Sequence, residues 1–233
     1  MLVLFDIDGT MLLTERAGVA AMLDAGRELF GTAFSFDGIE VAGRLDALIW
    51  SDLARRNNID ATEANHARFR ATYGTHLARK LRDTHRATPL PGVVDLIDRM
   101  ASSAGVTLGL LTGNYPETGR EKIRSAGIDP DRFGVAAWGI DGPTRRDLPP
   151  VAMSRCQVLS GRAVRPEQVV IIGDTPHDVD CARHHGCRCL AVATGAFTVA
   201  ELDAAGATRT VESLAATDDL ASWILGFRAA PTS

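Results

Sequence analysis

The sequence of 233 residues predicts an α/β fold in which a doubly wound parallel sheet carries an inserted, all-helical domain. Two observations predict the sheet: short apolar runs end in turn-forming or acidic residues, and amphipathic helical stretches separate these runs. A third observation predicts the insertion, because the alternation stops after the first apolar run and resumes only near residue 89. Two domains suit this length, since single domains usually have about 100–200 residues.

Four short apolar runs are the expected strands. Each is continuously apolar, which is typical of strands that are buried on both faces of a parallel sheet. They are Leu2–Phe5, Val106–Leu111, Val169–Ile172 and Cys189–Val192. Helices are expected between them; one is marked by apolar residues at helical spacing, namely Val93, Leu96, Ile97 and Met100. Strand and helix therefore alternate, as in right-handed βαβ units.

The inserted segment runs from about Thr14 to Thr88 and has no strand signal of comparable quality. It contains instead three apolar stripes at helical spacing. The stripes consist of Val19, Leu23, Gly26 and Phe30, of Leu45, Leu48, Ile49 and Leu53, and of Phe69, Tyr73, Leu77 and Leu81. The prolines after Thr88 stiffen the chain where the α/β pattern resumes. We expect a core domain of residues 1–14 and 89–233 and a helical domain of residues 15–88.

Composition and charge exclude several classes of protein. Apolar residues make up 45% of the chain and charged residues 23%, which is typical of a globular protein that folds in water. The net charge of −4 gives no basic field for nucleic acid, and no apolar segment approaches the roughly 20 residues of a membrane span. We expect a cytoplasmic monomer or homodimer that acts on a small molecule, with its four cysteines reduced.

The first expected strand ends in the motif Asp6-Ile7-Asp8-Gly9-Thr10, and the carboxyl ends of parallel strands are where ligands bind. Two carboxylates at positions i and i+2 leave the strand on the same side. Burial alone cannot neutralise both, so they indicate a metal, a bound cation or separate chemical roles. Taken by itself, the motif is also compatible with a polar turn that caps the next helix.

Two further strands end in polar motifs. Thr112-Gly113-Asn114 offers a hydroxyl and free amides to a phosphate group, although a turn with a helix cap would use the same residue types. Asp174 and Asp178 follow the third expected strand, one helical turn apart. Hard carboxylate oxygens of this kind suit Mg²⁺.

A fixed cation between these two motifs would complete such a site, because it would hold a carboxylate of the first motif and phosphate oxygens together. Arg145 and Arg146 are adjacent candidates just before a helix start with two prolines. We expect one of them to be functional and the other to face solvent.

These motifs, in this order, resemble the haloacid dehalogenase superfamily over essentially the whole chain: D-x-D-G-T, an apolar run followed by T-G-N, a basic residue, and G-D-x-x-x-D. The inserted segment resembles the helical cap of phosphoglycolate phosphatase and β-phosphoglucomutase relatives. The resemblance implies a Rossmann-like core that binds Mg²⁺ and a small phosphorylated substrate.

The resemblance also implies roles for single residues. Asp6 is the expected nucleophile, and Asp8 is the expected general acid and base. The phosphate is expected to be held by Thr112, Gly113, Asn114 and a basic residue. The expected Mg²⁺ ligands are Asp6, Asp174 and Asp8, the last through its carbonyl, with Asp178 in support.

One departure from the family pattern concerns the basic residue, which is usually Lys. Arg145 is followed by Leu148 and Pro150 at the spacing of an R-x-x-L-x-P variant of the motif, and it is the preferred catalytic cation. Arg146, which has Pro149 three residues on, is the alternative phosphate ligand. Arginine is always charged and can grip two oxygens, so the replacement preserves the electrostatics.

The expected activity is Mg²⁺-dependent hydrolysis of a small, phosphoglycolate-like monoester through an aspartyl phosphate. A phosphomutase and a non-enzymatic, receiver-like phospho-acceptor are the alternatives; the first would release no free phosphate, and the second would not turn over an ester. Asp8 disfavours a dehalogenase, which needs no second acid. In the helical domain, Arg44 is either a contact for an anionic leaving group or half of a solvated charge pair with Asp46 at a helix start.

Overall fold

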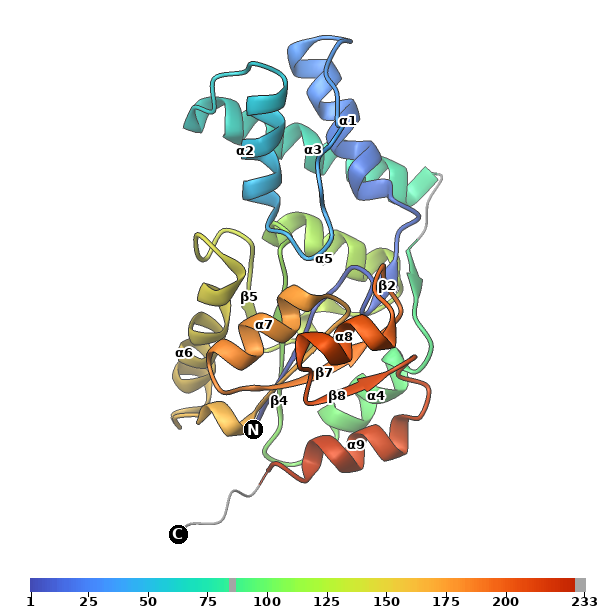
Figure 1. The fold of residues 1–233 in the computed structure, drawn as a ribbon, viewed down its shortest axis with the longest axis vertical. Helices are drawn as coiled ribbons and strands as arrows, with labels where there is room; N and C mark the ends of the chain where they lie inside the picture. The colour runs from blue at the N-terminus through green and yellow to red at the C-terminus, as the bar shows by residue number, and fades with distance from the viewer. Residues whose placement is uncertain (84–86, 229–233) are drawn as a thin grey trace.

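The computed structural model describes residues 1–83 and 87–228. Residues 84–86 and 229–233, which fall in the expected helical and core domains respectively, lie outside the described residues. Over the described chain, a six-stranded parallel sheet is covered by helices on both faces, and three more helices form a separate group at one end of the molecule (Figure 1). The predicted α/β fold with an inserted helical cap is therefore confirmed.

The sheet has the strand order β5-β4-β1-β6-β7-β8, and all neighbouring strands run parallel. The strands are β1 (Leu2–Phe5), β4 (Thr107–Leu111), β5 (Val135–Ala137), β6 (Val169–Gly173), β7 (Arg188–Val192) and β8 (Arg209–Val211). Phe5 at the end of β1 is in register with Leu110 on one side and with Ile172 on the other. The segments that follow these three strands consequently emerge side by side.

The central strand supplies both layers of the core, because successive side chains of a strand point to opposite faces. Val3 and Phe5 belong to one buried cluster, and Leu2 and Leu4 belong to the other. The first cluster is shared with α4 (Val93–Ala101), α5 (Pro116–Ser125) and α9 (Thr217–Leu225). The second is shared with α6 (Leu148–Ser160), α7 (Pro176–His184) and α8 (Val199–Ala205).

The three helices at the end of the molecule are α1 (Ala17–Phe30), α2 (Asp46–Arg56) and α3 (Glu63–Asp83), and they are called the cap below. Their position agrees with the three apolar stripes, but the buried face of α1 is shifted from the expected stripe. Gly26 of that stripe is buried, whereas Val19 is half-buried and lines a cavity, and Ala21, Met22 and Ala25 are buried in addition. Small side chains let α1 approach α3 closely, so they displace the larger ones from the helix contact.

The two passages between sheet and cap lie next to each other. The short strand β2 (Leu12–Leu13) leads into the cap, and β3 (Thr88–Pro89) leads out of it. They pair antiparallel, with Leu12 opposite Pro89 and Leu13 opposite Thr88. The division into domains at residues 14/15 and 88/89 stays a prediction.

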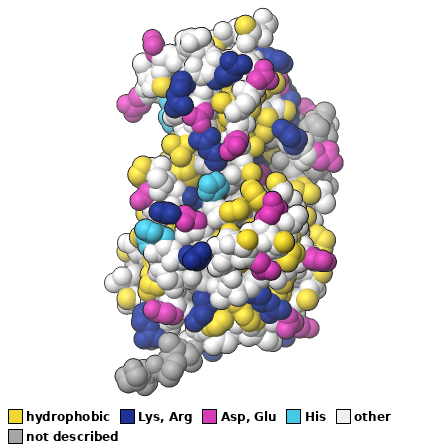
Figure 2. All heavy atoms as spheres, in the orientation of Figure 1, with side chains coloured by type: hydrophobic (Ala, Val, Ile, Leu, Met, Phe, Trp, Pro, Cys, Tyr) yellow, Lys and Arg dark blue, Asp and Glu magenta, His cyan; other side chains and the backbone are white. Residues whose placement is uncertain are grey.

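The surface carries charges of both signs. On the face shown in Figure 2, basic and acidic side chains are interspersed rather than gathered by sign. Among the described helices, none is both long enough and apolar enough to cross a membrane.

Candidate active site

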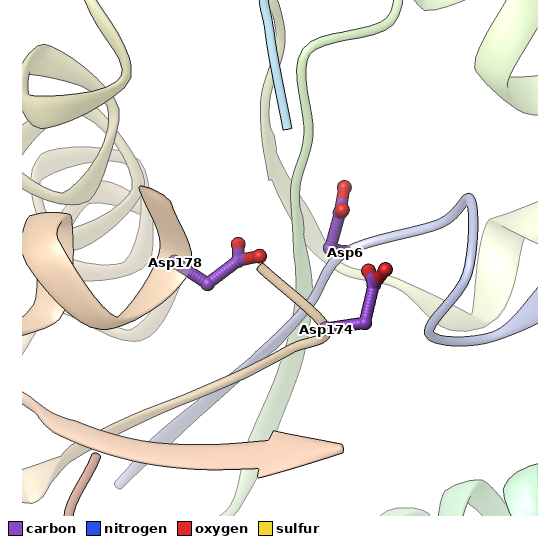
Figure 3. Close-up of side chains that lie close together, drawn as sticks. All are labelled: Asp6, Asp174 and Asp178. Atoms are coloured by element: carbon purple, nitrogen blue, oxygen red, sulfur yellow. The ribbon is translucent and has the colours of Figure 1, made fainter. Parts of the chain in front are cut away.

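Three buried aspartates converge where β1 and β6 end. Asp6 follows β1, Asp174 follows β6, and Asp178 lies in the first turn of α7. Figure 3 shows the three side chains gathered at this edge, with the Asp178 carboxylate pointing toward the other two, and one oxygen of each lies within 4.8 Å of the others. The parallel register of β1 and β6 causes this convergence, because it brings both strand ends to the same edge of the sheet.

The cluster concentrates negative charge in a poorly solvated place. Burial, reinforced by the charges of Asp6 and Asp178, raises the pKa of Asp174 to about 8. Burial also raises the pKa of Asp6 to about 6, although Arg145 opposes that shift. Ionised carboxylates at these positions therefore call for positive charge beyond that of one arginine.

Arg145 is buried beside the cluster. Its Nη2 lies 3.1 Å from Oδ2 of Asp6 and 2.5 Å from Oδ1 of Asp178, and its Nε donates to the same Asp178 oxygen at 3.1 Å. Against the effect of burial, Asp178 and Asp6 raise the pKa of Arg145 above its ordinary value. The other oxygen of Asp178 accepts hydrogen bonds from the Thr175 amide and hydroxyl, so Asp178 both caps α7 and fixes the guanidinium.

Arg146 lies elsewhere. It is exposed, and its Nε and Nη2 each donate to a carboxylate oxygen of Asp180 at 2.7 Å. Consecutive side chains of the short 3-10 turn Arg145–Asp147 point in different directions, and only the first points inward. The expectation that Arg146 binds phosphate is corrected accordingly.

The loop after Asp6 is shaped by close contact with Asp174. Thr10 donates its hydroxyl proton to Oδ1 of Asp174 at 2.8 Å. Gly9 has φ +77°, and a Cβ there would lie 2.3 Å from Oδ2 of Asp174, so no side chain fits. Asp8 lies two residues after Asp6 and lines the cavity, and 44% of its side-chain surface is exposed.

The 112–114 loop follows β4 and faces the same cavity. Thr112 and Asn114 are buried, and Nδ2 of Asn114 donates to the Thr112 hydroxyl at 2.9 Å and to Oδ2 of Asp8 at 2.9 Å. The sequence predicted a phosphate-binding loop here, and the structure brings it to the three aspartates and Arg145.

The cap is docked on this loop. The Asp46 amide donates to the Gly113 carbonyl at 2.7 Å, and the Tyr115 amide donates back to Oδ2 of Asp46 at 3.0 Å. A Cβ on Gly113 would lie 2.0 Å from the Arg44 carbonyl oxygen, so this approach requires glycine. Asp46 is therefore not half of a solvated pair: it is buried, and burial raises its pKa to about 7.

A cavity of about 500 Å³ lies between cap and core. It is lined by the three motif loops and by apolar side chains of the cap, among them Met22 and Ile49. Arg44 also lines it, but its Nη1 lies 2.6 Å from Oδ2 of Asp52, so that carboxylate already neutralises this guanidinium. The volume falls in the range of about 300–1,000 Å³ that is usual for small-molecule sites.

Lys122 is a site residue that the sequence analysis missed. It lies on the buried face of α5, and its Nζ donates to Oδ2 of Asp8 and to Oδ1 of Asn114, both at 2.6 Å. Two signals could have found it. The chain has 23 arginines but only two lysines, Lys80 and Lys122, and Lys122 falls on the inward face of its helix with Ile123.

Comparison with known proteins agrees with this geometry. The family described as haloacid dehalogenase-like hydrolase matches residues 1–186, which is most of the chain. The chain belongs to the haloacid dehalogenase-like hydrolases. The family resemblance seen in the motifs is thereby confirmed.

Two relatives in this family carry the name phosphoglycolate phosphatase. One, from Pseudomonas aeruginosa, is 29% identical over 206 residues, which cover 83% of this chain and 70% of the relative. The other, from Chromobacterium violaceum, is 26% identical over 225 residues, which cover 94% of this chain and 95% of the relative. The expectation of a phosphoric monoester hydrolase is confirmed, and the receiver-like alternative is set aside.

Solved structures share the fold. CbbY from Rhodobacter sphaeroides, in complex with phosphate, superimposes with a TM-score of 0.73 at 22% identity, covering 92% of this chain and 94% of CbbY. A haloacid dehalogenase-like family hydrolase from Streptococcus pneumoniae has a TM-score of 0.67 at 20% identity, covering 95% and 97% of the two chains. At these identities the likeness supports the fold alone.

Proposed function

We propose that this haloacid dehalogenase-like hydrolase uses Mg²⁺ to hydrolyse a small phosphate monoester through a phosphorylated Asp6. One observation carries the proposal: three buried carboxylates converge at the sheet edge against a buried Arg145, and a second, more exposed acid, Asp8, lies two residues from the first. Phosphoryl transfer needs a nucleophile in line, neutralisation of the phosphoryl oxygens and a proton for the leaving group. The residues of this cluster can provide all three with a divalent cation.

The donor set fits Mg²⁺. Carboxylate oxygens are the hard ligands that this ion takes. Burial, together with the charges of Asp6 and Asp178, raises the pKa of Asp174 to about 8, and a divalent cation would compensate for both effects. Asp6, Asp174 and the backbone carbonyl of Asp8 would hold the ion, and Asp178 would support it through Arg145. The ion would supply positive charge to the carboxylates and to the phosphoryl oxygens that approach them.

The residues then have distinct tasks. An oxygen of Asp6 forms a bond to phosphorus as the ester bond to the leaving group breaks, and Asp8 gives its proton to the departing oxygen. Asp8 next takes a proton from a water molecule whose oxygen attacks phosphorus, and the bond to Asp6 breaks. Arg145 and the 112–114 loop hold the phosphoryl oxygens in both steps, and the cap limits access of bulk water.

The proposed substrate is a small, carboxylated ester of the phosphoglycolate kind, because both named relatives are phosphoglycolate phosphatases. The proposed setting is the cytoplasm, where the four free and buried cysteines would stay reduced. A panel of small phosphate esters, assayed for free phosphate, tests the substrate class and separates hydrolysis from a mutase reaction.

The covalent step is tested by trapping. In Asp8→Asn, proton transfer is lost, so both steps should slow by about 10²–10⁴-fold. An aryl or acyl phosphate hardly needs a proton on its leaving group, so with such a substrate the first step should recover while hydrolysis of phospho-Asp6 stays slow. Intact-mass measurement of the quenched protein should then show an added phosphoryl group, and peptide mapping should place it on Asp6.

Asp6→Asn is the matched control, since it keeps the shape of the side chain but removes the nucleophile. It should neither turn over nor become labelled. Label on a histidine or serine, or substantial turnover by Asp6→Asn, would contradict the mechanism.

A further inference from the structure

Lys122 is a buried cation that none of the family motifs includes. It is 4% exposed, extends from α5 and lines the cavity. A buried ammonium group is costly unless it is paired, and its two partners are the side chains of Asp8 and Asn114, each at 2.6 Å. Its position therefore links the acid of the first motif to the loop of the second.

The two carboxylate oxygens of Asp8 differ in their hydrogen bonds. Oδ2 accepts one hydrogen bond from Lys122 at 2.6 Å and another from Nδ2 of Asn114 at 2.9 Å. Within residues 1–83 and 87–228, no side chain or backbone group donates a hydrogen bond to the other oxygen, Oδ1. One oxygen of Asp8 is fixed by two donors, and the other is left for a group that enters the cavity.

We propose that Lys122 is a positioning residue for phosphoryl transfer: with Asn114 it fixes Oδ2 of Asp8, so that Oδ1 exchanges the proton with the leaving group and then with water. This inference rests on the proposed function, because it takes Asp8 as the general acid and base. Proton transfer needs the two heavy atoms within about 2.6–3.2 Å. A carboxylate on an exposed loop that was free to rotate would meet this condition only part of the time.

The rest of the network keeps Lys122 in place. Asn114 is anchored to Thr112 at 2.9 Å, next to the expected phosphate position, so the acid and the phosphate-binding loop share one hydrogen-bonded chain. Thr118, Gly119 and Ile123 bury the same face of α5, which orients the lysine toward the cavity. The ammonium keeps its protons throughout, and no bond to it forms or breaks.

Lys122→Met tests the inference, because methionine keeps much of the length of lysine and removes the charge and the donors. The matched control is Lys80→Met, which removes the other lysine of the chain, paired with Asp24 in the cap at 2.7 Å. With an alkyl phosphate, kcat of Lys122→Met should fall by about 10²-fold or more, as when proton transfer is impaired. KM should change little, and Lys80→Met should behave as wild type.

Two further measurements separate positioning from a merely structural role. With an aryl phosphate in single turnover, release of the phenolate should be largely restored in Lys122→Met, while release of phosphate stays slow. In addition, the double variant Asp8→Asn/Lys122→Met should lose no more activity than Asp8→Asn alone, because the lysine acts through that acid.

The inference is overturned if Lys122→Met loses alkyl and aryl turnover equally, if its loss adds to that of Asp8→Asn, or if only KM rises. Thermal unfolding monitors folding, and Lys122→Gln replaces Lys122→Met in the same comparisons if the latter does not fold. Failure of the wild type to release phosphate from any ester would instead overturn the proposed function. If the wild type releases phosphate and Lys122→Met is as active as the wild type, this inference alone is overturned.

Discussion

Separate replacement of Arg145 and Arg146 by methionine compares a buried cation with an exposed neighbour of the same kind. Nη2 of Arg145 lies 3.1 Å from Asp6 and 2.5 Å from Asp178. At an effective dielectric constant of about 20, these distances correspond to attractions of roughly 5 and 7 kcal/mol before desolvation is subtracted. Removal of one partner from a buried pair lowers the free energy of unfolding by about 3–5 kcal/mol net.

We therefore expect Arg145→Met to lose about 3–5 kcal/mol in urea unfolding at pH 8. The loss should be smaller near pH 5, because protonation of Asp6, whose pKa is about 6, removes part of the uncompensated charge. Turnover should fall by about 10²-fold or more at a temperature where the variant stays folded, since a fixed charge-stabilising donor is lost.

Arg146→Met is the control for this experiment. Water screens the exposed pair of Arg146 with Asp180, so both stability and turnover should stay near those of wild type. The reasoning is refuted if Arg146→Met is the damaging variant, or if Arg145→Met keeps wild-type stability and rate.

Three further predictions follow from the site and from the docked cap. Phosphate release should stop with EDTA and return with Mg²⁺. Ca²⁺ should restore it poorly, because this ion prefers more ligands and looser geometry. Full activity in metal-free buffer would contradict the metal site. Asp46 binds its extra proton only in the folded state between pH about 4 and 7, so wild-type stability should fall as pH rises through that range. A change from pH 5 to pH 8 crosses about two pH units of this range, so Asp46→Asn should remove up to about 3 kcal/mol of the fall. Thermal unfolding of the two proteins at pH 5 and pH 8 measures this, and parallel curves would count against it. Gly113→Ala should hold the cap away from the core, because its Cβ would meet the Arg44 carbonyl. Small-angle scattering should show a more extended molecule, and turnover of an alkyl phosphate should be slower. An unchanged scattering profile would show that cap docking tolerates the methyl group.

The site residues at the ends of β1, β4 and β6 could be predicted from the sequence. A continuous apolar run that ends in a polar motif fixes both the strand and the place where its last side chain leaves the sheet. Asp6, Thr112 and Asp174 meet in the structure for that reason. The edge strands β5 and β8 escaped prediction because each has three residues, too few to show a periodic pattern.

The remaining site features depend on tertiary contacts that a linear pattern does not contain. The spacing of Leu148 and Pro150 favoured Arg145, and Pro149 left Arg146 as the alternative. The inward direction of Arg145 depends on Asp178, a residue on another helix. Asp46 looked like a solvated helix start and is buried only because the cap docks on Gly113. Lys122 lies eight residues after Asn114 and outside every motif, and it reaches Asp8 only through the packing of α5 against the sheet.

The antiparallel pair of β2 and β3 means that the chain enters and leaves the cap at a single point of attachment. Residues 14–87 can thus lengthen, shorten or be exchanged for another module without moving any strand of the sheet, because the ends of the insert are already held together. Glu15 and Arg16 follow this ribbon after Thr14, and both have positive φ, a conformation that costs a residue with a side chain backbone strain. The entry to the cap is therefore a strained turn beside a paired ribbon, which fixes the direction in which the first helix of the insert leaves the sheet domain.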